Sequence, residues 1–587
     1  MKHLLTSILL LAIPTLAIAQ QHPLPPTWQG IQHRSDPITR VYLPPQRVMW
    51  TNSDTLVTNT SVLLTIKNGQ TELGTNNTCA MHTNANDTAS ILLDYGRELH
   101  GGIKLVLGSS SSQAPSWVRI RFGESVGEAC SESFSQEWRM GYSTNDHAMR
   151  DLTLQIPRDG QIELGNTGFR FVRIDLVEPS RTIHLKEATA ILCYRDIPYL
   201  GSFRCNDQRL NNIWLTGAYT VHLNMQEYLW DGIKRDRLIW LGDMHPETST
   251  ILSVFGGNEV VPRSIDAACQ QFPQPHWLND MSAYSLWYLI IMHQWYMHQG
   301  DLDYVRQHRD YIKGVIDHID SCVEADGTEH LADWRFLDWP SSPNTSGVEA
   351  GLRALLLWSL TDAGKLCDLL GEKKHADKCQ DIRQRIGKLV KPHNDLKQAA
   401  ALMAIAGIMT PEQACREVVS VEGAKGFSTF YGYYMLQALA MADRHQQALD
   451  IIREFWGAML DLGATTFWED FNLDWAHDAA RIDEFTPQGK HDVHGEYGDY
   501  CYKSYRHSLC HGWASGPTAW LSQHVLGIEV VEPSCKVIRI TPHLGDLEWV
   551  EGTYPTPQGV VNVRHERKQG KVVTTYTAPK GVRVILQ

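Results

Sequence analysis

The chain has 587 residues and a mass of 66.4 kDa. Because a single hydrophobic core usually serves roughly 100 to 200 residues, several packed units are expected. Hydrophobic residues make up 43% of the sequence and charged residues 20%, a balance typical of folded domains rather than of disordered chains. The net charge is −13 and no run of basic residues occurs, which argues against nucleic acid as a partner.

The first 19 residues have the pattern of a secretory signal peptide. A lysine near the start is followed by an apolar stretch from Leu4, and Ala17-Ile18-Ala19 supplies the small residues of a cleavage site. No later apolar run reaches the roughly 18 residues of a membrane helix. We therefore expect a mature chain that begins near Gln20, is secreted or periplasmic and has no membrane span.

Residues 20–200 are predicted to form an antiparallel β-sandwich. Apolar or alternating segments recur from about Thr51 to Arg195, and they include SILLDYG, GIKLVLG, SWVRIRFG and FRFVRIDLV. Gly, Asn and Ser residues separate these segments. Short strands at this spacing, with turns between them, are typical of a sandwich.

From Asn206 the apolar residues recur at three and four positions, so residues 201–527 are predicted to be helical. This length allows about a dozen helices joined by short connections. A closed ring of six helical hairpins, an (α/α)6 barrel, is the economical arrangement, and an open solenoid of helical pairs is the alternative. Strand patterns return in residues 528–587. The predicted fold is thus a multidomain α + β chain, in which a central barrel is flanked by the N-terminal sandwich and a small C-terminal β-sandwich domain.

The 12 cysteines include no C-x-x-C pair, which disfavours a zinc ribbon. In an oxidising compartment, Cys79 with Cys130 or Cys501 with Cys510 are possible pairs, and buried free thiols are the alternative. Histidine is frequent, with 26 residues, but the histidines show no recognised ligand spacing. We expect neither a metal nor a cofactor.

Chemistry is concentrated in the stretch WDGIKRDRLIWLGD, residues 230–243. Its charged side chains would be costly inside a helical core without partners. If the residues from 236 onward are helical, Asp236, Trp240 and Asp243 fall within roughly 60° on one face. Two carboxylates and an indole would then point the same way. The competing interpretation is a solvated helix face with a salt bridge from Arg235.

Further acidic and aromatic residues occur together downstream. Glu469 lies in TTFWED, Asp338 and Trp339 lie in WRFLDW, and His511 lies in SLCHGW. Two carboxylates that are distant in sequence suggest hydrolysis of a glycosidic bond, because one carboxyl group protonates the leaving oxygen while the other activates water or attacks the sugar. Tryptophan provides a flat surface for the apolar face of a sugar.

The segment DGIKRDRLIWLGD resembles the signature of glycoside hydrolase family 78, the α-L-rhamnosidases. The likeness continues in DYGRELHGG, GFRFVRID, FLDW, TTFWE, SLCHGW and VIRITPHLGDLEWVEGTYPTPQGVVNV. The resemblance implies an exo-acting enzyme that removes terminal α-linked L-rhamnose from oligosaccharides or glycosides with inversion. It also implies a role for each matching residue: Asp236 as general acid, Glu469 as general base, Asp231, Arg235 and Asp243 as contacts to rhamnose hydroxyls, and Trp240 and Trp339 as pocket walls with Asp338 and His511 nearby.

The sequence departs from the family pattern in two places. Many members have Glu where Asp236 stands, and Glu247 is therefore a reserve candidate for a site role. The stretch from Asp470 to Leu509 is also longer than expected. Two other functions stay open: another (α/α)6 enzyme that acts on a different deoxy sugar or a uronide, and a carbohydrate-binding protein without catalytic activity.

Overall fold

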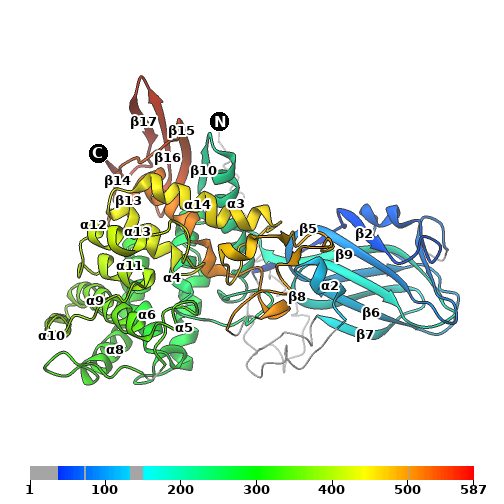
Figure 1. The fold of residues 1–587 in the computed structure, drawn as a ribbon, viewed down its shortest axis with the longest axis horizontal. Helices are drawn as coiled ribbons and strands as arrows, with labels where there is room; N and C mark the ends of the chain where they lie inside the picture. The colour runs from blue at the N-terminus through cyan, green and yellow to red at the C-terminus, as the bar shows by residue number, and fades with distance from the viewer. Residues whose placement is uncertain (1–36, 72–73, 133–149, 333, 501–502) are drawn as a thin grey trace, which may run out of the picture. The chain divides into compact units, whose positions relative to one another are not determined.

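The computed structural model describes residues 37–71, 74–132, 150–332, 334–500 and 503–587. The predicted signal peptide and Cys501 lie outside these residues. From Ile38 to Gln587 the chain packs as one unit, with strands first, helices in the middle and strands again at the end (Figure 1). The mixed α and β content predicted from the sequence is confirmed. Within the described ranges, no helix combines the length and the apolar character needed to cross a membrane.

Nine strands in the described N-terminal region form one hydrogen-bonded sheet. Its main path runs β3-β4-β9-β5-β8-β6-β7, with β1 paired to β9 and β2 paired to β5. Neighbouring strands are antiparallel. The strands are β1 (Ile38–Leu43), β2 (Arg47–Thr51), β3 (Val57–Thr58), β4 (Cys79–His82), β5 (Ala89–Leu107), β6 (Ser116–Gly123), β7 (Asp151–Ile156), β8 (Gly160–Leu176) and β9 (Thr182–Arg195).

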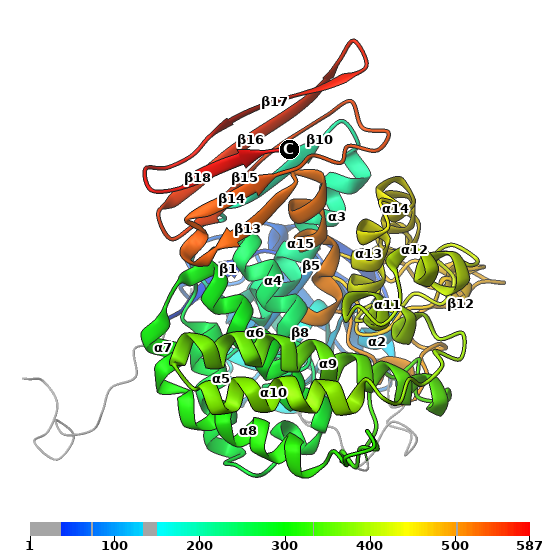
Figure 2. The same ribbon diagram turned by 90° about the vertical axis from the view of Figure 1, so that its left-hand side faces the viewer.

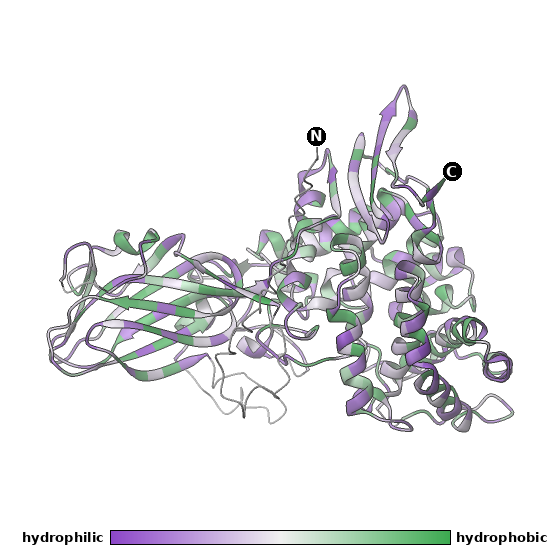
Figure 3. Cartoon of the chain, turned by 180° about the vertical axis from the view of Figure 1, so that it is seen from behind, coloured by the Kyte–Doolittle hydropathy of each residue, from purple (hydrophilic) through white to green (hydrophobic). Residues whose placement is uncertain are grey.

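Alternating side chains of these strands build the N-terminal core. Ile91 of β5 pairs with Ile174 of β8, and Leu93 pairs with Val172; all four side chains are fully buried. Successive residues of a strand point to opposite faces, so an alternating sequence gives the sheet one apolar side. Figure 3 shows hydrophobic and hydrophilic residues alternating along these strands.

The helices predicted from apolar spacing are present. α6 and α9 are followed by Gly300 and Gly371, each with φ of 72°, a conformation that glycine adopts without strain. α9 packs against both α6 and α10 (Figure 2). The main helices are α3 (Gln208–Asn224), α4 (Met244–Val254), α5 (Val260–Gln271), α6 (Ser282–Gln299), α7 (Leu302–Gln307), α8 (Arg309–Ser321), α9 (Thr345–Leu370), α10 (Lys373–Ile386), α11 (Lys397–Ile405), α13 (Gly432–Met441), α14 (His445–Asp461) and α15 (Gly516–Trp520). A short helix, α2 (Val126–Cys130), lies in the N-terminal region.

Two small sheets contain the C-terminal strands. One has the order β10-β15-β16-β17, and the other is made of β13, β14 and β18. β10 comes from residues before the first long helix, yet it pairs with β15 near the C-terminus, with Ser202 opposite Thr553. The strands are β10 (Ser202–Cys205), β13 (Ile528–Glu532), β14 (Val537–Ile540), β15 (Trp549–Thr556), β16 (Gly559–Lys568), β17 (Lys571–Thr577) and β18 (Arg583–Leu586).

One expectation from the sequence is wrong, and one pair of alternatives is decided. Residues 236–243 are not helical but form bends and turns, and α4 begins only at Met244. The cysteines within the described residues are free, and they include Cys79, Cys130 and Cys510. Cys79 and Cys130 therefore do not pair, in agreement with the alternative of free thiols.

Candidate active site

Asp231 organises the loop between α3 and α4. Its carboxylate accepts hydrogen bonds from the backbone N–H of Asp236 at 2.8 Å and of Leu238 at 3.0 Å. Aspartate commonly bonds to backbone groups a few residues further on, and such bonds compete with helix formation. They explain why this stretch is a loop. Burial, with the Asp236 carboxylate nearby, raises the pKa of Asp231 to about 7, so Asp231 keeps a proton in mildly acidic solution.

Arg235 joins the two carboxylates that the sequence assigns to catalysis. Its side chain is buried, with Nη2 3.3 Å from Oδ1 of Asp236 and Nη1 3.5 Å from Oε2 of Glu469. Two oxygens that contact the two terminal nitrogens of one guanidinium lie no more than about 9 Å apart. Asp236 and Glu469, which are far apart in sequence, therefore meet at one place in the fold.

Residues 508–513 lie beside Glu469 and hold it in place. Its carboxylate accepts the Ser508 N–H at 3.2 Å, and its own N–H donates to the Ser508 carbonyl at 3.0 Å. The Glu469 carbonyl accepts from the indole of Trp513 at 2.8 Å and from the Thr429 hydroxyl at 2.6 Å. The backbone at Glu469 is thus fixed on both sides, which orients its carboxylate.

His511 lies between two acids. Its Nε2 is 3.0 Å from Oδ2 of Asp243, and its Nδ1 is 3.7 Å from Oε1 of Glu469. Burial alone would lower the pKa of this imidazole, but Glu469, Asp243 and Asp231 outweigh it and raise the pKa to about 9. His511 is therefore a cation at neutral pH. Tyr284 donates to the other oxygen of Asp243 at 3.2 Å.

These side chains surround a cavity of about 430 Å³. Both charged side chains and aromatic rings line it. Trp339 stacks on Tyr500 with ring centroids 6.1 Å apart, and Trp240 meets Tyr284 edge to face at 5.9 Å. The lining residues are Asp231, Arg235, Asp236, Trp240, Asp243, Met281, Tyr284, Trp334, Phe336, Trp339, Glu469, Arg506, His511 and Trp513.

Two of the predicted residues, Asp338 and Glu247, do not line the cavity. Asp338 is buried, and its carboxylate accepts from Ser428 at 2.6 Å and from Gln398 at 3.0 Å. It therefore holds the segment that carries Trp339. Glu247 is fully buried in the first turn of α4 and has no hydrogen-bond partner among the described residues. Burial and two nearby aspartates raise its pKa well above the usual range, so its carboxyl group is neutral.

Sequence reasoning did not select Tyr284, Met281 or Arg506 for the site. Met281 directly precedes α6 and Tyr284 lies in its first turn, in an apolar run that is typical of a core helix. Arg506 lies in the long stretch between the two downstream motifs. The sole signal for Tyr284 was a hydroxyl within an apolar helix, because the hydroxyl of a buried Tyr usually finds a hydrogen-bond partner.

Two groups of possible metal ligands occur in the described residues, and neither lines the cavity. The first is Asp443, His445 and His543. The two imidazoles stack at 3.6 Å with an angle of 4° between their planes, so their in-plane lone pairs do not converge on one ion. The second is Glu124, Glu128 and His494, where the ammonium of Lys234 already lies between the two acids.

Comparison with known families decides the classification. Residues 198–525 match the model of the bacterial α-L-rhamnosidase six-hairpin glycosidase domain, and residues 527–587 match the bacterial α-L-rhamnosidase C-terminal domain. The chain belongs to the bacterial α-L-rhamnosidase family. The resemblance to glycoside hydrolase family 78 that the sequence predicted is confirmed. A search of curated proteins finds no match.

Solved structures share the fold of this family member. The family 78 rhamnosidase of Bacillus sp. GL1 is 20% identical with a TM-score of 0.72 over 90% of this chain. A Klebsiella oxytoca rhamnosidase with rhamnose bound is 20% identical with a TM-score of 0.63 over 83% of this chain and 95% of its own. The Streptomyces avermitilis α-L-rhamnosidase complexed with L-rhamnose is 16% identical with a TM-score of 0.64 over 87% of this chain. Our chain spans 55% of the Bacillus protein and 50% of the Streptomyces protein, about half of each.

Proposed function

We propose that this chain is an exo-acting glycoside hydrolase that removes terminal α-linked L-rhamnose from glycans or glycosides with inversion. The observation that carries the proposal is that Arg235 contacts both Asp236 and Glu469 at an aromatic-lined cavity. Family membership supports hydrolysis of a rhamnoside, and two of the similar structures hold rhamnose.

In the proposed reaction, the Asp236 carboxyl group gives its proton to the glycosidic oxygen while the bond from that oxygen to the sugar breaks. Glu469 takes a proton from the water molecule that attacks the anomeric carbon from the opposite face. The aglycone leaves as an alcohol, and exchange with solvent restores both carboxyl groups. Inverting enzymes place these groups roughly 6.5 to 9.5 Å apart. The upper limit of about 9 Å that Arg235 imposes is compatible with that range.

The other predicted residues that line the cavity form the sugar site in this proposal. Asp231, Arg235 and Asp243 contact its hydroxyls, and the His511 cation stabilises negative charge beside Glu469. Trp240 and Trp339 cover its apolar face. The aromatic rings at Trp334 and Phe336 extend the same wall and suit an aglycone that is itself flat or apolar.

The larger architecture that we propose keeps the predicted boundaries. Residues 1–19 direct secretion to the periplasm or the exterior, residues 20–200 form a β-sandwich, residues 201–527 form an (α/α)6 catalytic barrel and residues 528–587 form a C-terminal β-sandwich domain. The described N-terminal sheet, the paired helices and the two C-terminal sheets support this division.

The decisive experiment combines two variants, Asp236→Asn and Glu469→Gln. We expect the wild type to release L-rhamnose from aryl α-L-rhamnosides, and each variant to lose about 1000-fold or more in turnover. Both should still bind rhamnose in calorimetry, because Asn and Gln keep the shape of the side chains. Proton NMR of the first product should show the β-anomer.

Three outcomes separate the alternatives. Activity on another deoxy sugar or on an unsaturated uronide, but not on rhamnosides, assigns a different enzyme. Rhamnose binding without turnover by the wild type assigns a binding protein. Release of the α-anomer first contradicts inversion.

A further inference from the structure

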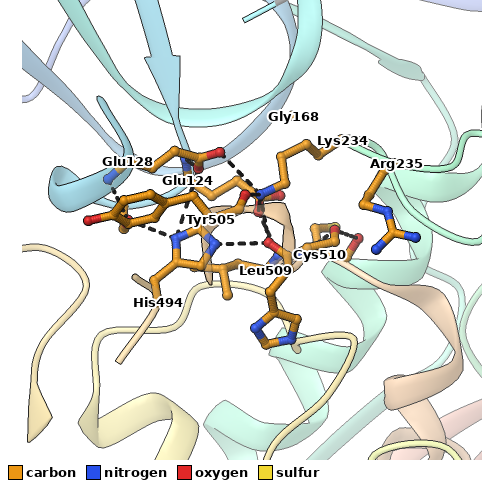
Figure 4. Close-up of polar contacts among 12 residues, drawn as sticks. Glu124, Glu128, Gly168, Lys234, Arg235, His494, Tyr505, Leu509 and Cys510 are labelled. Carbon is orange, nitrogen blue, oxygen red and sulfur yellow. Dashed lines mark hydrogen bonds and ion pairs between the residues drawn. The ribbon is translucent and has the colours of Figure 1, made fainter. Parts of the chain in front are cut away.

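A buried polar cluster lies next to both proposed catalytic segments and outside the sugar cavity. Figure 4 shows the Lys234 side chain among Glu124, Glu128 and His494. The Lys234 ammonium is 2.9 Å from Glu124 Oε2 and 3.2 Å from Glu128 Oε1. It also donates to the backbone carbonyls of Tyr505 at 2.8 Å and His507 at 2.6 Å. We call this group the Lys234 cluster.

The acids of the Lys234 cluster come from the N-terminal β region, whereas Lys234 comes from the loop before α4. Glu124 follows β6, and Glu128 lies in α2. Both side chains are 0% exposed and that of Lys234 is 1% exposed. Arg150 contacts Glu128 at 2.6 Å, so two cations balance two acids. A charge buried to this degree needs all of its partners, because removing one leaves the others unpaired.

Glu124 has a second contact that connects it to the proposed base. Its Oε2 accepts the Leu509 N–H at 2.6 Å. The preceding residue, Ser508, gives its N–H to the Glu469 carboxylate. On the other side, Lys234 is bonded through the chain to Arg235 and Asp236. One carboxylate oxygen of Glu124 thus holds the segment of the proposed acid and the segment that fixes the proposed base.

We propose that Glu124, through Lys234 and Leu509, is a positioning residue that sets the relative placement of Asp236 and Glu469. The inference rests on the proposed function of these two carboxyl groups. It gives the N-terminal β region a part in the reaction, although none of the residues described there lines the sugar cavity. Positioning of this kind matters because a displacement of about 1 Å in a catalytic group lowers the rate by up to about 100-fold.

Lys234 and Glu124 differ in what they hold, and this difference provides the test. Lys234→Met removes the anchor of the acid segment, whereas Glu124 still accepts the Leu509 N–H of the segment that fixes the base, so the rate should fall most on substrates whose leaving group needs a proton. We expect about a 100-fold loss of kcat on an alkyl rhamnoside and less than about a 10-fold loss on 2,4-dinitrophenyl rhamnoside. Glu124→Gln disturbs both segments, so kcat should fall by about 100-fold on both substrates.

The matched control is Asp175→Asn. Asp175 forms a buried ion pair with Arg121 at 2.6 Å in the same sheet, and neither residue contacts residues 230–243 or 505–511 in the described contacts. This variant should lose stability but keep the kcat ratio of the two substrates, with rates expressed per rhamnose-binding site. Should Glu124→Gln or Lys234→Met fail to fold, Glu124→Asp keeps the charge but shortens the reach by one methylene, and kcat should fall by about 10-fold on both substrates.

The results separate a failure of the proposed function from a failure of the positioning role. If the wild type is inactive on every rhamnoside, the proposed function fails. If the wild type is active and the folded Lys234 and Glu124 variants keep kcat within 3-fold and the substrate ratio unchanged, the function stands and the positioning role is overturned.

Discussion

His511 keeps a positive charge in a place where burial alone would remove it. Its side chain is 2% exposed, and Asp243 and Glu469 lie on opposite sides of the ring. Each acid stabilises the cation, and the cation in turn lowers the cost of keeping two carboxylates in one cavity. The charge of the cavity therefore depends in part on the protonation of this ring.

The first prediction concerns the stability of the protein between pH 7 and pH 9. The pKa of His511 is raised to about 9 in the folded state, against about 6.5 in an unfolded chain. The folded state therefore binds more protons in this interval, and the resulting stabilisation, complete below about pH 6.5, is lost as the pH rises through 9. We expect the difference in unfolding free energy between wild type and His511→Gln to shrink by about 2 kcal/mol from pH 7 to pH 9. Urea unfolding at several pH values measures it, and a constant difference would contradict a charged His511.

The second prediction separates Glu247 from Asp236. The Glu247 carboxyl group is buried and has a raised pKa, so the neutral amide of Glu247→Gln matches its charge and shape. We expect kcat/KM to stay within about 3-fold of the wild-type value, since no charge is lost. Asp236→Asn, assayed with the same aryl rhamnoside, should lose about 1000-fold. The opposite pattern would move the general acid to Glu247.

The residues of the cavity were predictable mainly through the family resemblance. Of the predicted residues, Asp236 and Glu469 meet at Arg235, as a site of two carboxylates requires. Spacing alone offered no reason to join residues so distant in sequence. Tyr284 was not predicted because its place in an apolar run indicates core packing, and its bond to Asp243 depends on how α6 meets the loop before α4. Such contacts between distant elements leave no local pattern.

At the scale of elements, the loop from Asp231 to Asp243 was expected to be a helix, yet the residues that the helix would have brought together do lie together. Helical spacing placed Asp236, Trp240 and Asp243 on one face, and all three do line the cavity. They do so from a loop, because the Asp231 carboxylate takes the N–H groups of Asp236 and Leu238. Apolar periodicity does not detect bonds of this type, whereas it located α6, α9 and the long strands correctly.

The third prediction concerns the aromatic wall carried by residues 334–339. Trp339 packs against Phe336 and stacks on Tyr500, which presents a fixed flat surface to the cavity. Trp339→Ala removes that surface, and we expect KM for an aryl rhamnoside to rise by about 10-fold or more with a smaller change in kcat. Trp117→Ala is the control, because Trp117 is 44% exposed on β6 and should leave both constants unchanged. An unchanged KM for Trp339→Ala would remove this ring from the binding site.

At the scale of the whole described unit, the C-terminal sheets and the helices share one hydrophobic core. Ile538, Val550 and Val561 belong to the same buried cluster as residues of α3, α4 and α6. β10, which precedes α3, is a strand of the C-terminal sheet. The sequence indicated a separate β-domain because strand patterns begin only after the helices, and a four-residue strand such as β10 is too short to stand out. We therefore expect the sheets to brace the helices and to unfold with them.

The fourth prediction tests this coupling with two valines of the same sheet. Val561 in β16 is 0% exposed, whereas Val573 in β17 is 43% exposed. Val561→Asp buries a carboxylate without a partner at a cost of several kcal/mol, while Val573→Asp changes stability by about 0.5 kcal/mol or less. Because the core is continuous, Val561→Asp should lower the melting temperature of the helical circular dichroism signal at 222 nm, and Val573→Asp should not. If the helices of the Val561 variant melt at the wild-type temperature, the C-terminal sheets fold independently and contribute nothing to the stability of the catalytic region.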